Sequence, residues 1–127
     1  MKILVDTNRL TDFFRGDRAL GELMERADQV WIPFVVLAEL RAGFLGGSRS
    51  TANQERLSAF LRKPGIGVLF ADNRTTQVWA ALLTQLRKLG RPIPSNDLWI
   101  AALAVQHEMT LLTRDRHFGE IPQLDLR

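Results

Sequence analysis

Four carboxylate residues in this chain stand where they could hold a metal ion. Asp6 and Asp115 each follow a short apolar run, Glu39 lies within the apolar stretch VVLAELRAG, and Asp97 opens the apolar stretch DLWIAALA. Carboxylates that converge repel one another unless a cation joins them, and hard oxygen ligands favour Mg²⁺ or Mn²⁺. The absence of cysteine and the presence of only two histidines argue against zinc. The sequence therefore predicts a magnesium or manganese site, provided that the fold brings these residues together.

The elements around the acids indicate how they would meet. The run Ile3–Val5 is continuously apolar, which fits a strand covered on both faces, as in a parallel sheet. The carboxyl ends of such strands form the edge where α/β proteins bind ligands. We therefore expect Asp6 and Asp115 at one edge. The helix that Asp97 opens leads back to the strand before Asp115, and Glu39 faces the same edge if its helix packs beside the first strand.

The rest of the chain alternates between strand and helix patterns, which favours a single α/β domain over residues 1–127 with a mainly parallel central sheet flanked by helices. The predicted strands are 3–5, 30–32, 67–70, 109–113 and 124–126. The predicted helices are 9–16, 17–28, 33–47, 51–62, 74–89 and 97–108. In the long helix 74–89 we expect Val78, Leu82, Leu86 and Leu89 to point inward.

Composition sets further bounds. The 127 residues are 46% apolar, enough for one ordinary core, and no apolar run approaches the ~18 residues that cross a bilayer. We expect a cytoplasmic protein without disulfides, a signal peptide or a membrane contact. The net charge is +3, and 14 of the 17 basic residues are Arg. Arg binds phosphate in a bidentate manner, which suggests nucleic acid, but an Arg bias can also reflect genomic base composition.

Each acid also has a plainer interpretation. Asp97 or its neighbour Asn96 could be a helix N-cap, Asp115 a turn residue, and Glu39 the exposed position of an amphipathic helix. His107 is expected to cap the end of its helix, and His117 to lie in a surface loop or contact a phosphate. Trp99 is expected in the core. The four acids together are harder to explain in this way than any one alone.

Two other α/β classes place an Asp after the first strand. Phosphotransferases with an aspartyl nucleophile need a second Asp two residues on, where this chain has Asn8. Phospho-receiver domains need an acidic pair near the first strand; the third strand does lead to Asp72, but no acidic pair accompanies Asp6. Both classes are disfavoured.

Four segments together resemble the motifs of the PIN-domain nucleases: LVDTN at 4–8, LAELRAG around Glu39, NDLWIAALA at 96–104 and LLTRDRHF at 111–118. Their order and spacing are similar to those of the VapC toxins of bacterial toxin–antitoxin modules. The resemblance implies an endoribonuclease dependent on Mg²⁺ or Mn²⁺ and neutralised by a cognate antitoxin. By position, the acidic quartet is Asp6, Glu39, Asp97 and Asp115. The polar neighbours that orient it are Thr7, Asn8, Asn96 and Thr113.

Arg9 departs from the family pattern, which has an apolar residue after DTN. If Arg9 points outward it can meet RNA, and if it points inward it must find a carboxylate. Arg9, Arg114 and Arg116 are the candidates for contacts with the RNA backbone, with solvated loop charges as the alternative. Hydrolysis would use a water activated by the bound ion, since no Cys or Ser–His pair offers a covalent nucleophile.

The resemblance also implies the partners. These are a structured RNA, such as tRNA or ribosomal RNA, and an antitoxin that brings an Arg or Lys near the carboxylates. Phe13, Phe14 and Phe44 exceed the needs of a small core, so we expect an apolar surface and a homodimer. Two alternatives stay open: an RNA-maturation nuclease without an antitoxin, and a non-catalytic PIN domain that only binds RNA or protein.

Overall fold

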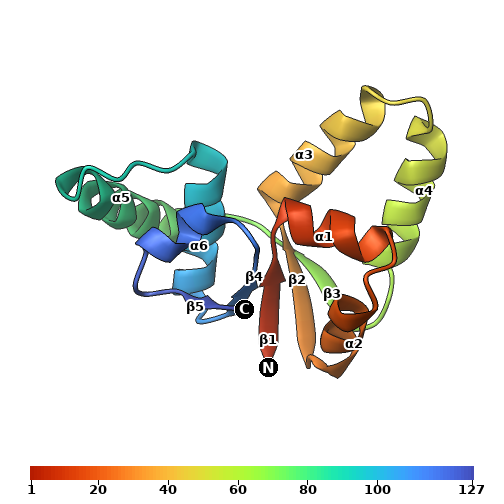
Figure 1. Cartoon of the computed structure of the whole chain (residues 1–127), viewed down its shortest axis with the longest axis horizontal. Coiled ribbons are helices and arrows are strands. Elements are labelled where there is room, and N and C mark those ends of the chain that lie inside the picture. The colour runs from red at the N-terminus through yellow and green to blue at the C-terminus, as the bar shows by residue number, and fades with distance from the viewer.

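The computed structural model describes all residues, 1–127, and has a five-stranded sheet in the order β3-β2-β1-β4-β5 (Figure 1). Every neighbouring pair of strands is parallel. The strands are β1 (Lys2–Val5), β2 (Gln29–Pro33), β3 (Ile66–Leu69), β4 (Thr110–Leu112) and β5 (Asp125–Leu126). This confirms the predicted α/β fold with a parallel sheet.

Six α-helices connect the strands and flank the sheet. They are α1 (Thr7–Phe14), α2 (Arg18–Arg26), α3 (Phe34–Leu45), α4 (Ser50–Leu61), α5 (Asn73–Lys88) and α6 (Ser95–Gln106). Figure 1 shows α1 to α4 on one side of the sheet, with α3 and α4 forming a projecting hairpin, and α5 and α6 on the other side. This division follows from right-handed crossovers, because the chain moves outward from β1 to β3 and then back across to β4.

The reversal between β3 and β4 creates a switch point beside β1. The connection that leaves β1 runs to β2 on one side, while β4 is added on the other side. In open parallel sheets ligands bind outside the carboxyl ends of the strands at such a point. The fold therefore directs attention to the ends of β1 and β4, where Asp6 and Asp115 are found.

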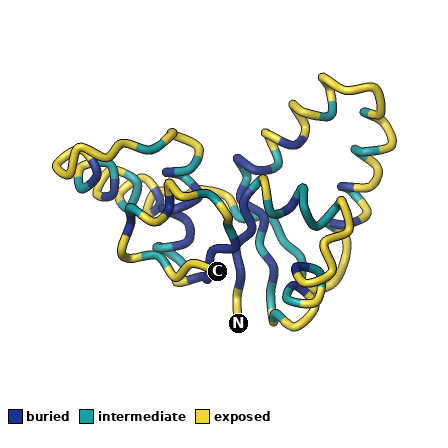
Figure 2. Tube along the Cα trace, viewed as in Figure 1, coloured by how far each residue is buried: buried dark blue, intermediate teal, exposed yellow.

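The core is densest around these two strands. Ile3, Leu4 and Val5 in β1 are fully buried, as are Leu111 and Leu112 in β4 to within 1%. Helix α6 covers them with residues 100–104, all buried, and Figure 2 shows the central strands as the most buried part of the trace. Burial on both faces explains why these strands are continuously apolar in sequence instead of alternating.

Three local predictions were wrong. The segment after β4 contains a short 3-10 helix (Arg116–Glu120) where we expected only a loop. Helix α1 begins at Thr7, directly after Asp6, and not at Arg9. Leu89 is exposed, because it is the C-cap of α5 and the chain turns away at Gly90, whose φ is +65°.

The expected apolar surface at Phe13, Phe14 and Phe44 was also misjudged. All three side chains are half-buried against the core. Phe13 and Phe14 form a cluster with Phe60, with ring centroids 5.3 Å from that of Phe60. The exposed large apolar side chains lie elsewhere: Met1, Leu45, Phe70, Leu89 and Leu126. No helix combines the length and apolar character needed to cross a membrane.

Candidate functional site

Asp6 is held at the end of β1 by several contacts and is only 4% exposed. Its backbone N–H still donates to the carbonyl of Leu112 in β4, at 3.2 Å, so the residue stays in register with the neighbouring strand. Its side chain caps α1 by accepting a hydrogen bond from the N–H of Arg9, at 2.9 Å. The carboxylate is therefore fixed in direction before any ligand arrives.

Thr113 joins the two strand ends through its hydroxyl group. The hydroxyl donates to Oδ2 of Asp6 and accepts a hydrogen bond from the backbone N–H of Asp115, at 3.0 Å. The predicted role of Thr113 in orienting the acids agrees with these contacts. Asp115 is in turn the N-cap of the 3-10 helix, and its Oδ1 accepts from the N–H of His117 at 2.9 Å.

Asp97 comes from the other side of the sheet, in the first turn of α6. The helix begins at Ser95 after Pro94, and no side chain caps it. The alternative that Asp97 or Asn96 is an N-cap therefore does not hold. Instead, Oδ2 of Asp97 lies 3.1 Å from Nδ1 of His117.

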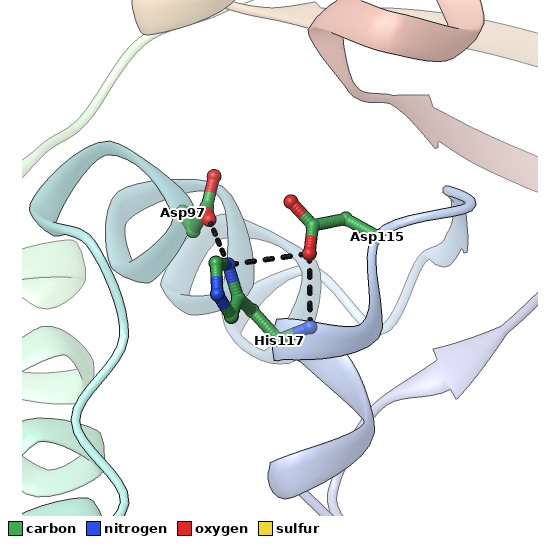
Figure 3. A group of neighbouring side chains, drawn as sticks. All are labelled: Asp97, Asp115 and His117. Carbon is green, nitrogen blue, oxygen red and sulfur yellow. Dashed lines mark hydrogen bonds and ion pairs between the residues drawn. The ribbon is translucent and has the colours of Figure 1, made fainter.

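Asp97, Asp115 and His117 form a compact group of candidate metal ligands (Figure 3). One ligand atom from each lies within 4.8 Å of the other two. Nδ1 of His117 sits between the two carboxylates, 3.1 Å from Oδ2 of Asp97 and 3.2 Å from Oδ1 of Asp115. Asp6 and Glu39 are not members of this tight group.

Glu39 approaches from α3 and is held by the first turn of α1. Its Oε1 accepts a hydrogen bond from the hydroxyl of Thr7, at 3.0 Å, and Thr7 directly follows Asp6. Glu39 is an exposed residue. Thr7, predicted to orient the acids, thus joins its side chain to that of Glu39 directly beside Asp6.

The pKa values of Asp6 and Asp97 are raised, first by burial and to a smaller extent by the neighbouring carboxylates. Burial is the main cause that raises the pKa of Asp6; the hydrogen bonds from Thr113 and Arg9 oppose it, and the charges of Asp115 and Asp97 raise it further. Burial also raises the pKa of Asp97, which a hydrogen bond with His117 lowers and the charge of Asp115 raises. Both shifts report negative charge that the surrounding protein does not fully neutralise.

This donor set fits a divalent cation. Carboxylate oxygens from Asp97 and Asp115 face one another across a short gap, and the charge of a nearly buried Asp6 is coupled to both. A hard divalent ion is the species that such oxygens bind, and it would remove the mutual repulsion. The fit rests on the chemistry of the donors and on the unrelieved charge.

Two of the predicted polar neighbours do not reach the acids. Asn8 and Asn96 are exposed, and neither hydrogen-bonds to any of the four carboxylates. Each lies in a helix next to a site residue, Thr7 or Asp97, and successive residues of a helix face directions about 100° apart. Sequence proximity alone therefore overestimated their part in the site.

Of the three arginines predicted to contact RNA, two are paired with carboxylates of the protein and one is not. Arg9 points inward: it pairs with Asp12 at 3.2 Å and with Asp17 at 3.9 Å, and its Nε is buried without a partner. Arg114 also pairs with Asp12, at 3.0 Å, and this contact is the main cause that raises its pKa and lowers that of Asp12. Arg116 is exposed and makes no ion pair. The inward alternative for Arg9 is thus the observed one.

Sequence reasoning gave His117 and Asp12 too little weight. The spacing Asp-x-His at the start of a short helix was a usable signal for His117, because a capping Asp accepts a hydrogen bond from the backbone of the residue two positions later and so lies close to it. Asp12 lies three residues after Arg9, the spacing of a helical ion pair, but its contact with Arg114 spans 102 positions. Such a contact cannot be read from local spacing.

A hollow of about 370 Å³ at the other edge of the sheet contains none of the predicted site residues. It lies near the amino ends of β2 and β3 and is lined in part by Met24, Asp28, Val30 and Lys63. We take the acids at the switch point as the functional site in preference to this hollow, because Asp97, Asp115 and His117 bring their ligand atoms together there. A hollow of about 490 Å³, lined in part by Thr113, Asp115 and Arg116, lies beside them.

Comparison with known proteins now identifies the class. Residues 3–124 match the family model of the PIN domain. The chain therefore belongs to the PIN-domain family.

Several of the proteins that it resembles are named VapC ribonucleases. It is 35% identical to Ribonuclease VapC4 of Mycobacterium tuberculosis over 95 residues, which cover 75% of this chain and 73% of that protein. It is 30% identical to VapC ribonuclease Y4jK of Sinorhizobium fredii over an alignment 132 positions long, which covers 98% of this chain and 94% of the relative. The structure of VapBC2 from Rickettsia felis, bound to a DNA fragment from its promoter, contains a chain that matches with a TM-score of 0.88 and 28% identity, over 100% of this chain and 98% of that one. The resemblance predicted from the four motifs is confirmed.

The raised pKa of Asp6 predicts a stabilising effect of Asp6→Asn in the absence of divalent ions. The folded state binds the Asp6 proton more tightly than the unfolded chain does, so protonated Asp6 stabilises the fold of wild type. That stabilisation is lost as pH rises from the ordinary pKa of 3.8 through the raised pKa. Asn also caps helices. At neutral pH with chelator, the variant should be more stable by on the order of 1 kcal/mol.

Denaturant unfolding of both proteins at several pH values measures this difference. The advantage of Asp6→Asn should shrink as pH falls through the raised pKa and disappear well below 3.8, where Asp6 is protonated in both states. A variant less stable than wild type at neutral pH, or an advantage that does not change with pH, would contradict the account of Asp6.

Proposed function

We propose that this chain is a metal-dependent endoribonuclease that acts as a toxin and is inhibited by a cognate antitoxin. The observation that carries the proposal is the convergence of Asp6, Asp97 and Asp115 at the switch point of the sheet, where the pKa values of Asp6 and Asp97 are raised. The relatives named as VapC ribonucleases support the reaction. The likeness to the Rickettsia felis VapBC2 structure supports an antitoxin partner.

Asp97 and Asp115 would hold the ion, with Asp6 and Glu39 completing the acidic quartet, and the ion would be Mg²⁺ or Mn²⁺. When bound, such an ion activates water and neutralises charge on the phosphoryl oxygens. Thr113 keeps the Asp6 carboxylate aimed at the site, and Thr7 does the same for Glu39. These threonines remove the freedom that would otherwise let the acids turn away from one another.

The substrate we propose is a structured RNA such as tRNA or ribosomal RNA. Arg116 is the best candidate for a phosphate contact, because it lies next to Asp115, is exposed and has no carboxylate partner. Arg114 would reach a phosphate only by leaving Asp12, and Arg9 is held inward. Residues 1–127 would act as one PIN domain in the cytoplasm.

Two alternatives are weaker. A non-catalytic PIN domain would not need unrelieved acids at its switch point, since burying a charged carboxylate destabilises the fold. An RNA-maturation nuclease would share the site but not the antitoxin. The antitoxin proposed here would place an Arg or Lys beside the carboxylates and so take the place of the ion.

RNA cleavage should require a divalent ion and be lost in Asp97→Asn and Asp6→Asn. Each change removes one ligand charge with little change of shape, so the rate should fall at least about a hundredfold. Incubating hairpin RNA with purified protein, with Mg²⁺ or with excess chelator, measures the effect. Asp28→Asn is the matched control, because Asp28 pairs with the N-terminal amine away from the site. Undiminished cleavage in chelator would contradict the proposal.

We also propose a homodimer, in which exposed Phe70 contributes to the interface. Phe70 is 67% exposed and stacks on Phe34, which contacts Trp99 edge-on, so the exposed ring continues an aromatic row. Light scattering at micromolar concentrations should report a dimer for wild type and a monomer for Phe70→Ser. The control is Leu45→Ser, which removes an exposed apolar side chain from the end of α3. A wild-type monomer would contradict the dimer, and a dimeric Phe70→Ser would contradict this interface.

A further inference from the structure

His117 is aimed at the acidic site by a two-residue spacing. Asp115 caps the 3-10 helix by accepting from the backbone N–H of His117, and the same oxygen, Oδ1, lies 3.2 Å from the ring nitrogen Nδ1. Asp115 thus contacts both the backbone and the ring of His117. Figure 3 shows the ring turned toward both carboxylates, from the segment opposite Asp97.

The ring nitrogen lies where a ligand of a shared ion would lie. Nδ1 is 3.1 Å from Oδ2 of Asp97, and the three ligand atoms are all within 4.8 Å of one another. The ring is half exposed, so it can shift slightly without breaking packing in the core. An ion that Asp97 and Asp115 hold would be within reach of this nitrogen.

Imidazole changes which ion the site prefers. Mg²⁺ is bound through oxygen and gains little from nitrogen, whereas the first-row transition ions accept imidazole as well as carboxylate. An all-carboxylate site would therefore differ in selectivity from one with two carboxylates and a histidine.

We propose that His117 is a nitrogen ligand of the divalent ion in this site and that it favours Mn²⁺ over Mg²⁺. This inference rests on the proposed function, because it assumes an ion among the acids. The competing role for the ring is that of a hydrogen-bond donor that spans Asp97 and Asp115 and moves aside when an ion binds.

The chain offers a matched control in its only other histidine. His107 is the C-cap of α6, while Asp97 is in the first turn of that helix. The two ends are separated by about 15 Å along the helix axis. His107→Gln therefore makes the same chemical change as His117→Gln without touching the site.

Pulsed electron paramagnetic resonance of bound Mn²⁺ tests the ligand directly, since an imidazole nitrogen on the ion gives a characteristic coupling. The full chain without a histidine tag is loaded with less than one equivalent of Mn²⁺, as wild type, His117→Gln and His107→Gln. We expect nitrogen coupling in wild type and His107→Gln and none in His117→Gln.

Titration calorimetry with Mn²⁺ and with Mg²⁺ gives the second readout. In His117→Gln the affinity for Mn²⁺ should fall about tenfold, while that for Mg²⁺ should change much less. His117→Asp, which offers oxygen in place of nitrogen, should bind Mg²⁺ more tightly than His117→Gln and still lack the coupling.

The outcomes separate this inference from the proposed function. Bound Mn²⁺ without nitrogen coupling in wild type, or coupling that persists in His117→Gln, would overturn the role of His117 and leave the metal site intact. Failure of wild type to bind either ion would overturn the proposed metal-dependent function, and this inference with it.

Discussion

The repulsion among carboxylates at one edge of the sheet is the constraint around which the rest of this structure is arranged. Two such charges ~4 Å apart interact unfavourably by about 1 kcal/mol in water and about 4 kcal/mol near a protein surface. Asp6 is nearly buried, so water screens it poorly. A fold that keeps these acids together must hold each one firmly, and the hydrogen bonds of Thr113 and Thr7 do so.

The backbone offsets part of this repulsion. Asp6 caps α1, Asp115 caps the 3-10 helix and Asp97 lies in the first turn of α6, so all three stand at helix N-termini. Free N–H groups and the positive end of the helix dipole stabilise a negative charge there, by about 0.3–1 kcal/mol each. The pKa values of Asp6 and Asp97 are nevertheless raised, so this help is incomplete. A bound cation, as proposed, would supply the positive charge that the helices do not.

Much of this arrangement was predictable from the sequence, because it depends on local patterns. The apolar runs before Asp6 and Asp115 specified buried parallel strands, and parallel strands bring their carboxyl ends to one edge. What could not be predicted depends on contacts between distant segments. Asp12 in α1 pairs with Arg114 after β4 and also with Arg9, which explains why two candidate RNA contacts are engaged within the protein. The Phe13–Phe14 pair is covered by Phe60 from α4, and no local pattern indicates that contact.

The effect of a divalent ion on thermal stability tests the central claim most directly. Wild type and Asp97→Asn are melted in chelator, in Mg²⁺ and in Mn²⁺. If the acids form one cation site, the variant should melt at the same temperature as wild type or higher in chelator, because one repelling charge is gone. The ions should then raise the melting temperature of wild type more than that of the variant, since only ligands of the folded state stabilise it. Equal shifts in the two proteins would show that Asp97 does not hold the ion and would contradict the account.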